Sequence, residues 1–316
     1  MHGRRFNPWL LSLALWVAPL EITAYETDQF SHRLEPIADS TLVLNERVNA
    51  SIESTVAAWH GPRDDWKFVT AIYHDLGGHH WVDRIERWAM KSDEVERLQP
   101  SRRESIYQGH PFWATRVAGI FGVGPTIKLN GQLIGSDKLG HFFSQGKKFY
   151  RRYMNSGDEA QAAEHSAYTE RAIFGQLTTG VYSNADLVAN YEGFRFYLSL
   201  FEDNVIPGKP AILAWQEDHW VMQRDFTWAD HVNEYWDEAL NINHFDRILY
   251  PHMEKRLMTF CSDYFTAPEK YTINPNTESN LIEQYQDLEL RDTSDLRLDR
   301  LCRDEDSFPA MGSSSE

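Results

Sequence analysis

Apolar residues recur at helical spacing along much of this 316-residue chain. Within residues 45–59, for example, they stand three or four positions apart, at Val48, Ile52, Val56 and Trp59. Side chains spaced in this way share one face of a helix, and that face is usually buried. The same reasoning predicts further helices over residues 79–98, 137–154, 158–178, 184–202 and 228–240. The sequence therefore favours a mainly α fold, built as a helical bundle.

The segment "TIKLNGQLIGSD", residues 126–137, is the clearest exception to this helical pattern. Asn130 and Gly131 stand between alternating apolar residues, with Ile127 and Leu129 before them. An Asn-Gly pair tolerates positive φ at both central positions of a tight hairpin turn. We therefore expect one or two small β-hairpins in the fold, and we expect this one to lead directly into a helix.

Residues 1–24 have the form of a secretory signal peptide. Two arginines precede an apolar run from about Trp9 to Leu20, and Ala24 offers a small residue for cleavage. The run is short for a membrane span, although a buried helix or an uncleaved anchor is the alternative. No Cys follows it for lipid attachment, and no later run is long enough to span a bilayer. We expect a periplasmic or secreted protein, at most peripheral to the envelope membrane, with no transmembrane span in the mature chain.

The chain is strongly acidic. It holds 47 Asp and Glu residues against 31 Lys and Arg residues, a formal net charge of −16 at pH 7. Binding to the phosphates of nucleic acids depends on Lys and Arg that neutralise their charge. We therefore expect no nucleic-acid partner, and an acidic surface gives no help in binding anionic lipid.

The two cysteines, Cys261 and Cys302, are predicted to form a disulfide. An even number of cysteines in an oxidising compartment favours pairing over two free thiols. The bridge would close a loop of roughly 40 residues and stabilise the fold by roughly 3–4 kcal/mol. We interpret residues 25–261 as a mainly helical domain, and residues 262–316 as an acidic, partly disordered extension tied to it by the disulfide.

The candidate site lies in two motifs. "DKLGHF", residues 137–142, places Asp137 and His141 four positions apart, on one face of the expected helix. "SNADLVANYEG", residues 183–193, places Asp186 and Asn190 at the same spacing. Helical bundles build metal sites from carboxylate and His side chains on facing helices. With Glu170 from the helix between them, these residues could converge in the core of a bundle.

Two chemistries fit this set of residues. In the first, a divalent metal ion is bound by Asp137, His141, Glu170, Asp186 and Asn190. Such an ion would polarise a substrate or lower the pKa of water. In the second, His141 acts as a general base oriented by Asp137, and Lys138 stabilises developing negative charge. Single residues also have plain structural roles, because Asp137 in a first helical turn favours the helix dipole.

The two motifs resemble those of a family of uncharacterised bacterial periplasmic proteins, many of them small lipoproteins. Its members carry D-K-x-x-H-F and, further along the chain, S-x-x-D-x-x-x-(N or D)-x-x-G. The matching residues here are Asp137, Lys138, His141, Phe142, Ser183, Asp186, Asn190 and Gly193. The resemblance implies an envelope location and a site on paired helices, but no activity. This chain lacks the lipidation Cys and is much longer than the compact members.

Three functions remain open. The leading one is an envelope hydrolase centred on His141, Asp137 and Asp186, with lipid or peptidoglycan as a substrate suggested by location. The second is a non-catalytic envelope protein in which the same residues form a buried polar network. The third is glycan binding through the Trp-rich segment 215–245, where Asp237 or Glu238 could supply acids. Helical spacing of aromatic residues in that segment is more typical of a core.

Overall fold

The computed structural model describes residues 26–78, 82–110, 122–172 and 180–303, without the side chains of 169–172. Helices dominate these ranges, and the mainly α fold class is confirmed. The longer helices are α1 (Thr41–Ala57), α2 (Asp65–Leu76), α3 (Arg84–Lys91), α6 (Gly146–Ser156), α7 (Glu159–Ala172), α9 (Asn184–Ser199), α10 (Tyr250–Leu257) and α12 (Pro275–Gln284). Shorter helices are α5 (Asp137–Gly140), α11 (Cys261–Thr266) and α13 (Leu298–Leu301), with single 3-10 turns at η4 (Met258–Phe260), η5 (Pro268–Lys270) and η6 (Ser294–Leu296).

The strands are short and pair two by two. Two pairs are hairpins: β3 (Thr126–Leu129) with β4 (Gln132–Gly135), and β6 (Leu213–Gln216) with β7 (His219–Met222). Two further pairs join distant parts of the chain: β1 (Glu26–Thr27) runs parallel to β2 (Val123–Gly124), and β5 (Val181–Tyr182) is antiparallel to β8 (His244–Phe245). The first hairpin turns at Asn130 and Gly131, both at positive φ, as the sequence predicts.

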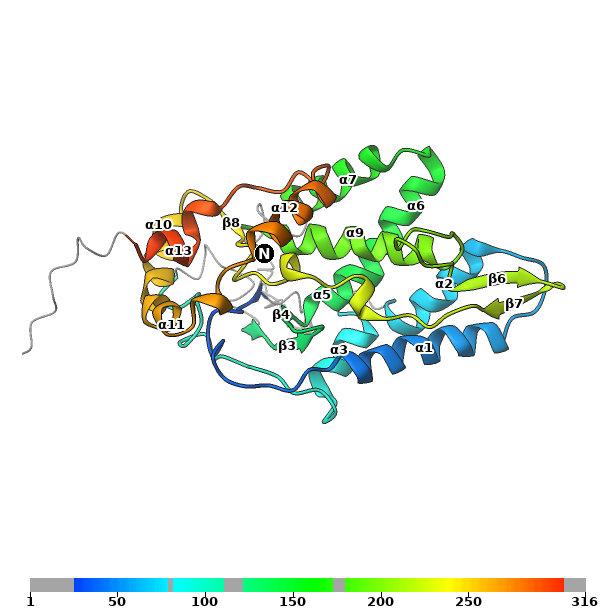
Figure 1. The fold of residues 1–316 in the computed structure, drawn as a ribbon, viewed down its shortest axis with the longest axis horizontal. Coiled ribbons are helices and arrows are strands. Elements are labelled where there is room, and N and C mark those ends of the chain that lie inside the picture. Colours follow the sequence, from blue (N-terminus) through cyan, green and yellow to red (C-terminus); the bar gives the residue numbers. More distant parts are fainter. Residues whose placement is uncertain (1–25, 79–81, 111–121, 173–179, 304–316) are drawn as a thin grey trace, which may run out of the picture.

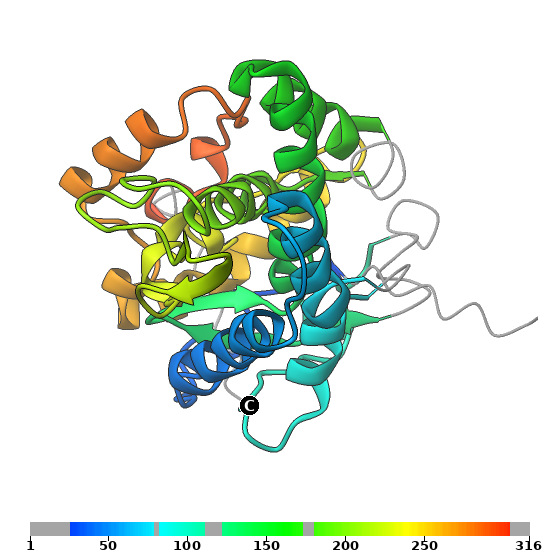
Figure 2. The same cartoon turned by 90° about the vertical axis from the view of Figure 1, so that its right-hand side faces the viewer.

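Helix α9 runs through the middle of the molecule (Figure 1). Helices α6 and α7 lie on one side of it and α1 on the other, while α10, α11 and α13 gather at the end opposite the β6–β7 hairpin. Seen from that hairpin end, α2 and α6 lie next to each other (Figure 2). Every residue of α9 from Asn184 to Asn190 is buried, which makes this helix the centre of the fold.

Helix α5, the π-helical turn η1 (His141–Gln145) and α6 form one continuous helix over residues 137–156. A π turn inserts an extra residue and changes the direction of the side chains beyond it; such turns often occur at functional sites. The turn begins at His141. Directly after it, Phe142 and Phe143 are fully buried and both contact Phe196 of α9.

The continuous helix approaches α9 closely at two glycines. A Cβ placed on Gly193 would lie 1.9 Å from the carbonyl oxygen of Phe142, and one on Gly146 would lie 2.6 Å from the backbone of Gly193. Side chains at either position would push the two backbones apart. The glycines therefore set the distance between the two helices that carry the sequence motifs.

The helix expected over residues 228–240 is wrong. The segment forms two short 3-10 turns, η2 (Trp228–Asp230) and η3 (Glu234–Trp236). Thr227 and Asn233 each accept a hydrogen bond from a backbone N–H two positions ahead. Local bonds of this kind compete with a continuous helix. The aromatic residues are nevertheless part of the core, because Trp228 and Trp236 are fully buried.

The helix expected over residues 79–98 is shorter than its apolar spacing indicates. Helix α3 ends well before Pro100, and residues 79–81 lie outside the described part of the chain. The guanidinium of Arg97 folds back and donates to two backbone carbonyls at the end of α3. The helix therefore ends where the side chain of Arg97 caps its last carbonyls, and not at Pro100.

The remaining expectations about domain organisation concern the two ends of the chain. The segment proposed as a signal peptide, residues 1–24, lies outside the described residues. The predicted disulfide between Cys261 and Cys302 is confirmed, with the two Cα atoms 5.5 Å apart. The extension that it closes includes α12 and α13, with Leu281 and Leu298 buried. Among the described residues, no helix combines the length and apolar character that a membrane crossing needs.

A buried polar network ties the extension to α9. The carboxylate of Glu192 is fully buried and accepts hydrogen bonds from Arg195, Tyr285 and Gln284, each at 2.9 Å. Its second oxygen lies 3.0 Å from Nδ1 of His231, which is also buried. Burial opposes ionisation of Glu192, but the hydrogen bond from His231 and the charge of Arg195 outweigh it and lower the pKa of the carboxyl.

Replacing Gly193 by Ala should destabilise the protein. On an exposed helix this change is stabilising, by up to about 1 kcal/mol, because Gly costs backbone entropy. Here the added methyl group meets the backbone of the neighbouring helix, and overpacking of this kind costs about 1–3 kcal/mol. Urea unfolding at neutral pH measures the difference. A variant as stable as the parent would contradict the close approach of the two helices.

The buried imidazole of His231 should make the free energy of unfolding fall as the pH is lowered through about 6.5. Burial lowers the pKa of His231 below its ordinary value of 6.5, in spite of the nearby Glu192. Below that pH the unfolded chain binds a proton that the folded chain does not, so acid favours unfolding. His110 and His244 also have lowered pKa values and contribute in the same direction. His231→Gln should reduce the slope between about pH 7 and 5, measured by urea unfolding across that range; an unchanged slope would contradict the assignment.

Candidate functional site

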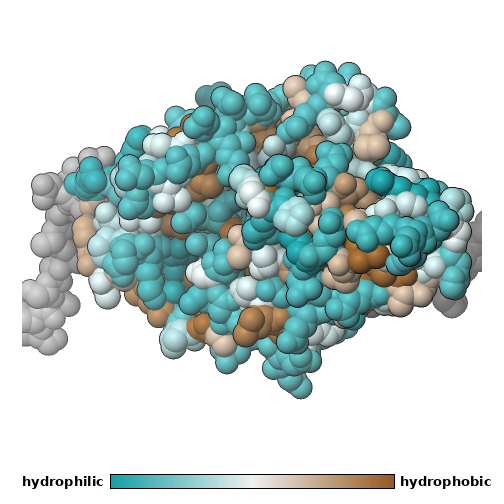
Figure 3. All heavy atoms as spheres, turned by 45° about the vertical axis from the view of Figure 1, so that its right-hand side comes forward, coloured by the Kyte–Doolittle hydropathy of each residue, from teal (hydrophilic) through white to brown (hydrophobic). Residues whose placement is uncertain are grey.

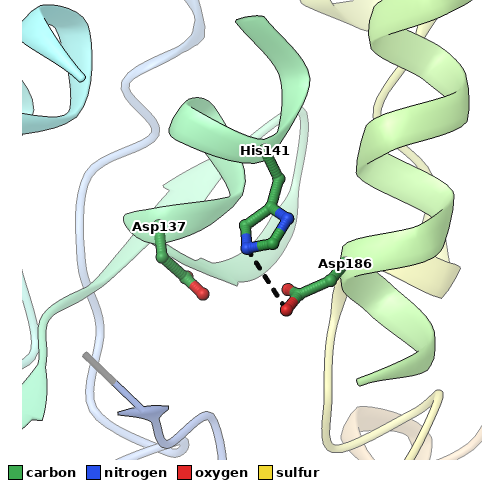
Figure 4. Close-up of side chains that lie close together, drawn as sticks. All are labelled: Asp137, His141 and Asp186. Atoms are coloured by element: carbon green, nitrogen blue, oxygen red, sulfur yellow. Dashed lines mark ion pairs between the residues drawn. The ribbon is translucent and has the colours of Figure 1, made fainter. Parts of the chain in front are cut away.

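The candidate site lies where the continuous helix of residues 137–156 faces the N-terminal turns of α9. The β3–β4 hairpin delivers the chain into α5, so Asp137 and His141 project from the first turns of that helix. On α9, Ser183 is the N-cap, and its hydroxyl accepts a hydrogen bond from the backbone N–H of Asp186. Figure 4 shows the three side chains of Asp137, His141 and Asp186 pointing toward one another across the gap between the helices.

The three side chains form a compact set of candidate ligands. One ligand atom from each of Asp137, His141 and Asp186 lies within 4.8 Å of the others. Nε2 of His141 lies 3.2 Å from Oδ2 of Asp186. Their side chains are 16%, 19% and 13% exposed, in chain order. The set is therefore largely screened from water but is not sealed from it.

Asn190 holds the imidazole of His141 in place. Nδ1 of His141 lies 3.0 Å from Oδ1 of Asn190, whose amide nitrogen donates to the hydroxyl of Ser166 at 3.1 Å. The amide oxygen only accepts, so Nδ1 carries the proton. A neutral imidazole then presents the lone pair of Nε2 to the carboxylate of Asp186, and the two repel. A cation between them, either a proton or a metal ion, removes this repulsion.

Lys138 is the electrostatic centre of the site. Its ammonium group is 1% exposed and lies 2.9 Å from Asp137, 2.6 Å from Asp186 and 2.7 Å from Glu238. Burial opposes its charge, but the three carboxylates outweigh burial and raise the pKa of Lys138 well above its ordinary value. The charge of His141 when its imidazole is protonated, together with that of Lys138, likewise overcomes burial and lowers the pKa of Asp186. One ammonium among three carboxylates leaves an excess of negative charge when His141 is neutral.

Glu238 belongs to the site, although the sequence analysis considers it only for glycan cleavage. Its carboxylate accepts hydrogen bonds from the hydroxyls of Ser183 at 3.1 Å and Thr27 at 3.3 Å, besides its ion pair with Lys138. Burial raises its pKa, although the charge of Lys138 acts against this. Glu238 comes from an irregular segment a hundred residues after Lys138, so no sequence spacing connects the two.

Two further acidic side chains, Asp83 and Glu86, lie against the continuous helix of residues 137–156. Glu86 of α3 is buried, and a Cβ on Gly140 would lie 2.7 Å from one of its carboxyl oxygens. Burial, together with the charges of Asp137 and Asp83, raises the pKa of Glu86 well above its ordinary value. The carboxylate of Asp83 accepts a hydrogen bond from Ser144 of the π turn, at 2.6 Å. A capping-box pattern, Asp83-x-x-Glu86, was the available sequence signal for this pair.

The structure thus brings together most of the residues singled out in the sequence. Asp137, His141 and Asp186 converge, Lys138 is buried between the acids, and Asn190 contacts the imidazole from behind. Glu170 lies on α7, but its side chain is outside the described part of the structure. Glu238, Glu86 and the supporting hydroxyl of Thr27 also belong to the site, and neither sequence motif includes them.

Replacing Lys138 by Met should destabilise the protein strongly, because it leaves three carboxylates without their shared ammonium. Removing one member of a buried ion pair costs about 3–5 kcal/mol. Glu238→Gln introduced into the same chain should restore part of the loss, since it removes one of the stranded charges. Urea unfolding of both single variants and the double variant, in chelator, gives the coupling energy. Strictly additive losses would mean that the two side chains do not interact.

Comparisons with known proteins add nothing to this geometry. Searches against family models, curated proteins and solved structures found no match to the chain. The candidate site therefore rests on its own residues: three convergent ligands on two facing helices, a buried ammonium, and a polar shell that orients them.

Proposed function

We propose that the protein is a divalent-metal-dependent hydrolase of the bacterial envelope, with Asp137, His141 and Asp186 as the metal ligands. The observation that carries the proposal is the convergence of these three ligand atoms, within 4.8 Å of one another, on two facing helices. Two carboxylates and one imidazole suit Zn, Mn and similar ions.

The geometry around His141 fits an ion. Zinc ligands bind at about 2.0–2.2 Å, which in a tetrahedral site places two neighbouring ligand atoms roughly 3.3–3.6 Å apart. The 3.2 Å between His141 Nε2 and Asp186 Oδ2 lies just below that range, so a small outward shift of either side chain would admit the ion. The hydrogen bond that His141 Nδ1 donates to Asn190 fixes the tautomer whose Nε2 lone pair can bind a metal, as outer partners of metal-bound histidines usually do. In addition, Oδ1 of Asp137 is buried and has no hydrogen-bond partner within the described residues.

The electrostatics support the same assignment. Lys138 neutralises part of the charge of Asp137, Asp186 and Glu238, and a divalent cation would offset the remainder. Such an ion supplies Lewis-acid polarisation of a substrate oxygen and a lowered pKa for water. Lys138 and Asn190 would hold the ligands in fixed positions. The partial exposure of the ligands leaves a substrate group a route to the site.

The envelope location and the class of substrate are supported by the sequence alone. The first 24 residues have the pattern of a signal peptide, the disulfide suits an oxidising compartment, and the motifs resemble those of periplasmic proteins. An envelope substrate, lipid or peptidoglycan, follows from that location. The Trp-rich segment gives the glycan-binding alternative little support, because Trp228 and Trp236 are buried in the core.

A second candidate function is a non-catalytic one, in which the cluster locks the fold. The specific observation in its favour is that Lys138 joins carboxylates from three separate segments while almost fully buried. Polar networks of this kind specify a unique packing. In that case a proton, and not a metal ion, lies between His141 and Asp186.

The purified full chain, prepared without chelator, should contain about one divalent ion per molecule, and chelation should lower its melting temperature. Restoring the ion at about a hundred times its Kd should return about 2.7 kcal/mol of stability. A His141→Ala/Asp186→Asn variant should contain no ion. Elemental mass spectrometry and calorimetry make these measurements, and hydrolysis of envelope lipid or peptidoglycan should be lost with the ion.

The matched control is Asp218→Asn/His219→Ala, which removes an Asp and a His from the exposed turn of the β6–β7 hairpin and should keep the ion. Absence of bound metal in the parent, with no rise in melting temperature on adding ions, would refute the metal site. A large loss of stability in the His141→Ala/Asp186→Asn variant under the same conditions would then favour the structural lock.

A further inference from the structure

The strongest unexplained feature outside the site is a group of cationic, aromatic and apolar side chains shared by α2 and α6. Its members are Trp66 and Tyr73 of α2 and Lys147, Arg151 and Met154 of α6, and we refer to them as the α2–α6 patch. Positions 147, 151 and 154 are spaced four and three apart, so they follow one face of the helix. Helices α2 and α6 are next to each other in the view of Figure 2.

The contacts within the patch join the two helices. Nζ of Lys147 lies 4.1 Å from the ring centre of Tyr73 and 4.9 Å from that of Trp66. Trp66 also stacks on Tyr150 of α6. Trp66 is 41% exposed and Met154 57% exposed, so two large apolar side chains stand in water beside the cations. Most of the face shown in Figure 3 is hydrophilic, with smaller hydrophobic areas between the polar ones.

The cations of α6 repel one another along the helix. Lys147 and Arg151, like Lys148 and Arg152, are like charges four positions apart, a pairing that weakens a helix. Burial and the charge of Arg151 lower the pKa of Lys147 to about 8. Within the described ranges, neither Lys147 nor Arg151 forms an ion pair, and the nearby Asp65 is bound to Arg63. The patch is a concentration of positive charge in a chain whose net charge is −16.

We propose that the α2–α6 patch docks the protein on the surface of an anionic phospholipid bilayer. The cations complement lipid phosphates, while Trp66 and Met154 enter the interfacial layer, where Trp side chains are favoured. A free phosphate ion would leave both apolar side chains in water. A long polyanion would also meet the acidic remainder of the protein.

The net negative charge of the chain does not oppose this docking. At physiological ionic strength, charges are screened beyond about 8 Å, so a membrane responds to the face that touches it and not to the whole molecule. The expectation drawn from composition, that the surface gives no help in binding anionic lipid, concerns the surface as a whole, whereas the proposal concerns one face of it. The inference is independent of the proposed metal site, although the same continuous helix carries both.

The test measures binding of the full chain to vesicles by co-sedimentation. One set contains equal parts of phosphatidylcholine and phosphatidylglycerol, and the other phosphatidylcholine alone. The chain should bind the anionic vesicles more tightly, and Lys147→Gln/Arg151→Gln should weaken this binding more than about tenfold, because each cation near the surface contributes. Trp66→Ala should weaken it by less, with unchanged dependence on salt.

The matched control is Arg247→Gln/Lys255→Gln, which removes the same charge from exposed positions at or near α10, at the opposite end of the molecule. It should bind the anionic vesicles as the parent does. The apolar N-terminal run is present in every variant, so its contribution cancels, and the phosphatidylcholine vesicles report it directly.

Two results would overturn the docking proposal. One is equal binding of the parent to both kinds of vesicle, or equal weakening by the two double variants. The other is patch-dependent binding to soluble polyphosphate without binding to vesicles, which would make an anionic polymer the partner. Because the variants leave Asp137, His141 and Asp186 intact, their metal content separates a failure here from a failure of the metal site.

Discussion

The ammonium group of Lys138 is the interaction on which the site depends. It joins carboxylates of α5, of α9 and of the segment after η3, which are far apart in the sequence. An unpaired buried charge is costly, so the ammonium and the carboxylates hold one another in the interior. The same charges position two of the three candidate metal ligands. Lys138, which the sequence suggests only as a stabiliser of developing negative charge, is in this way the electrostatic centre of the site.

The close packing of two helices makes that interaction possible. Gly146 and Gly193 allow the backbones to approach, and the π turn directs His141 toward Asp186 while Phe142 and Phe143 enter the core. A wider separation would move Asp186 away from both Lys138 and His141. The glycines at the helix crossing therefore allow the charged residues at its end to come together.

Much of the fold and part of the site could be predicted from local patterns. Helical spacing gave the mainly α class, and the Asn130-Gly131 pair gave the first hairpin, because both signals act over a few neighbouring residues. Asp137 and His141, four positions apart, were recognisable for the same reason. The helix predicted over 228–240 does not form, because Thr227 and Asn233 accept hydrogen bonds from backbone N–H groups two residues further along the chain. Apolar spacing does not reveal such bonds.

The sequence by itself determined the two helices that carry the motifs, the first hairpin and the pairing of Cys261 with Cys302, since each depends on local spacing or on there being a single partner. Only the tertiary structure decided that Glu238 and Glu86 join the site, and that Lys138 is buried and not solvated. It also decided that the cations of α6 meet the exposed Trp66 on one surface. These outcomes depend on which distant segments pack together, and burial then sets the charge and the role of each side chain.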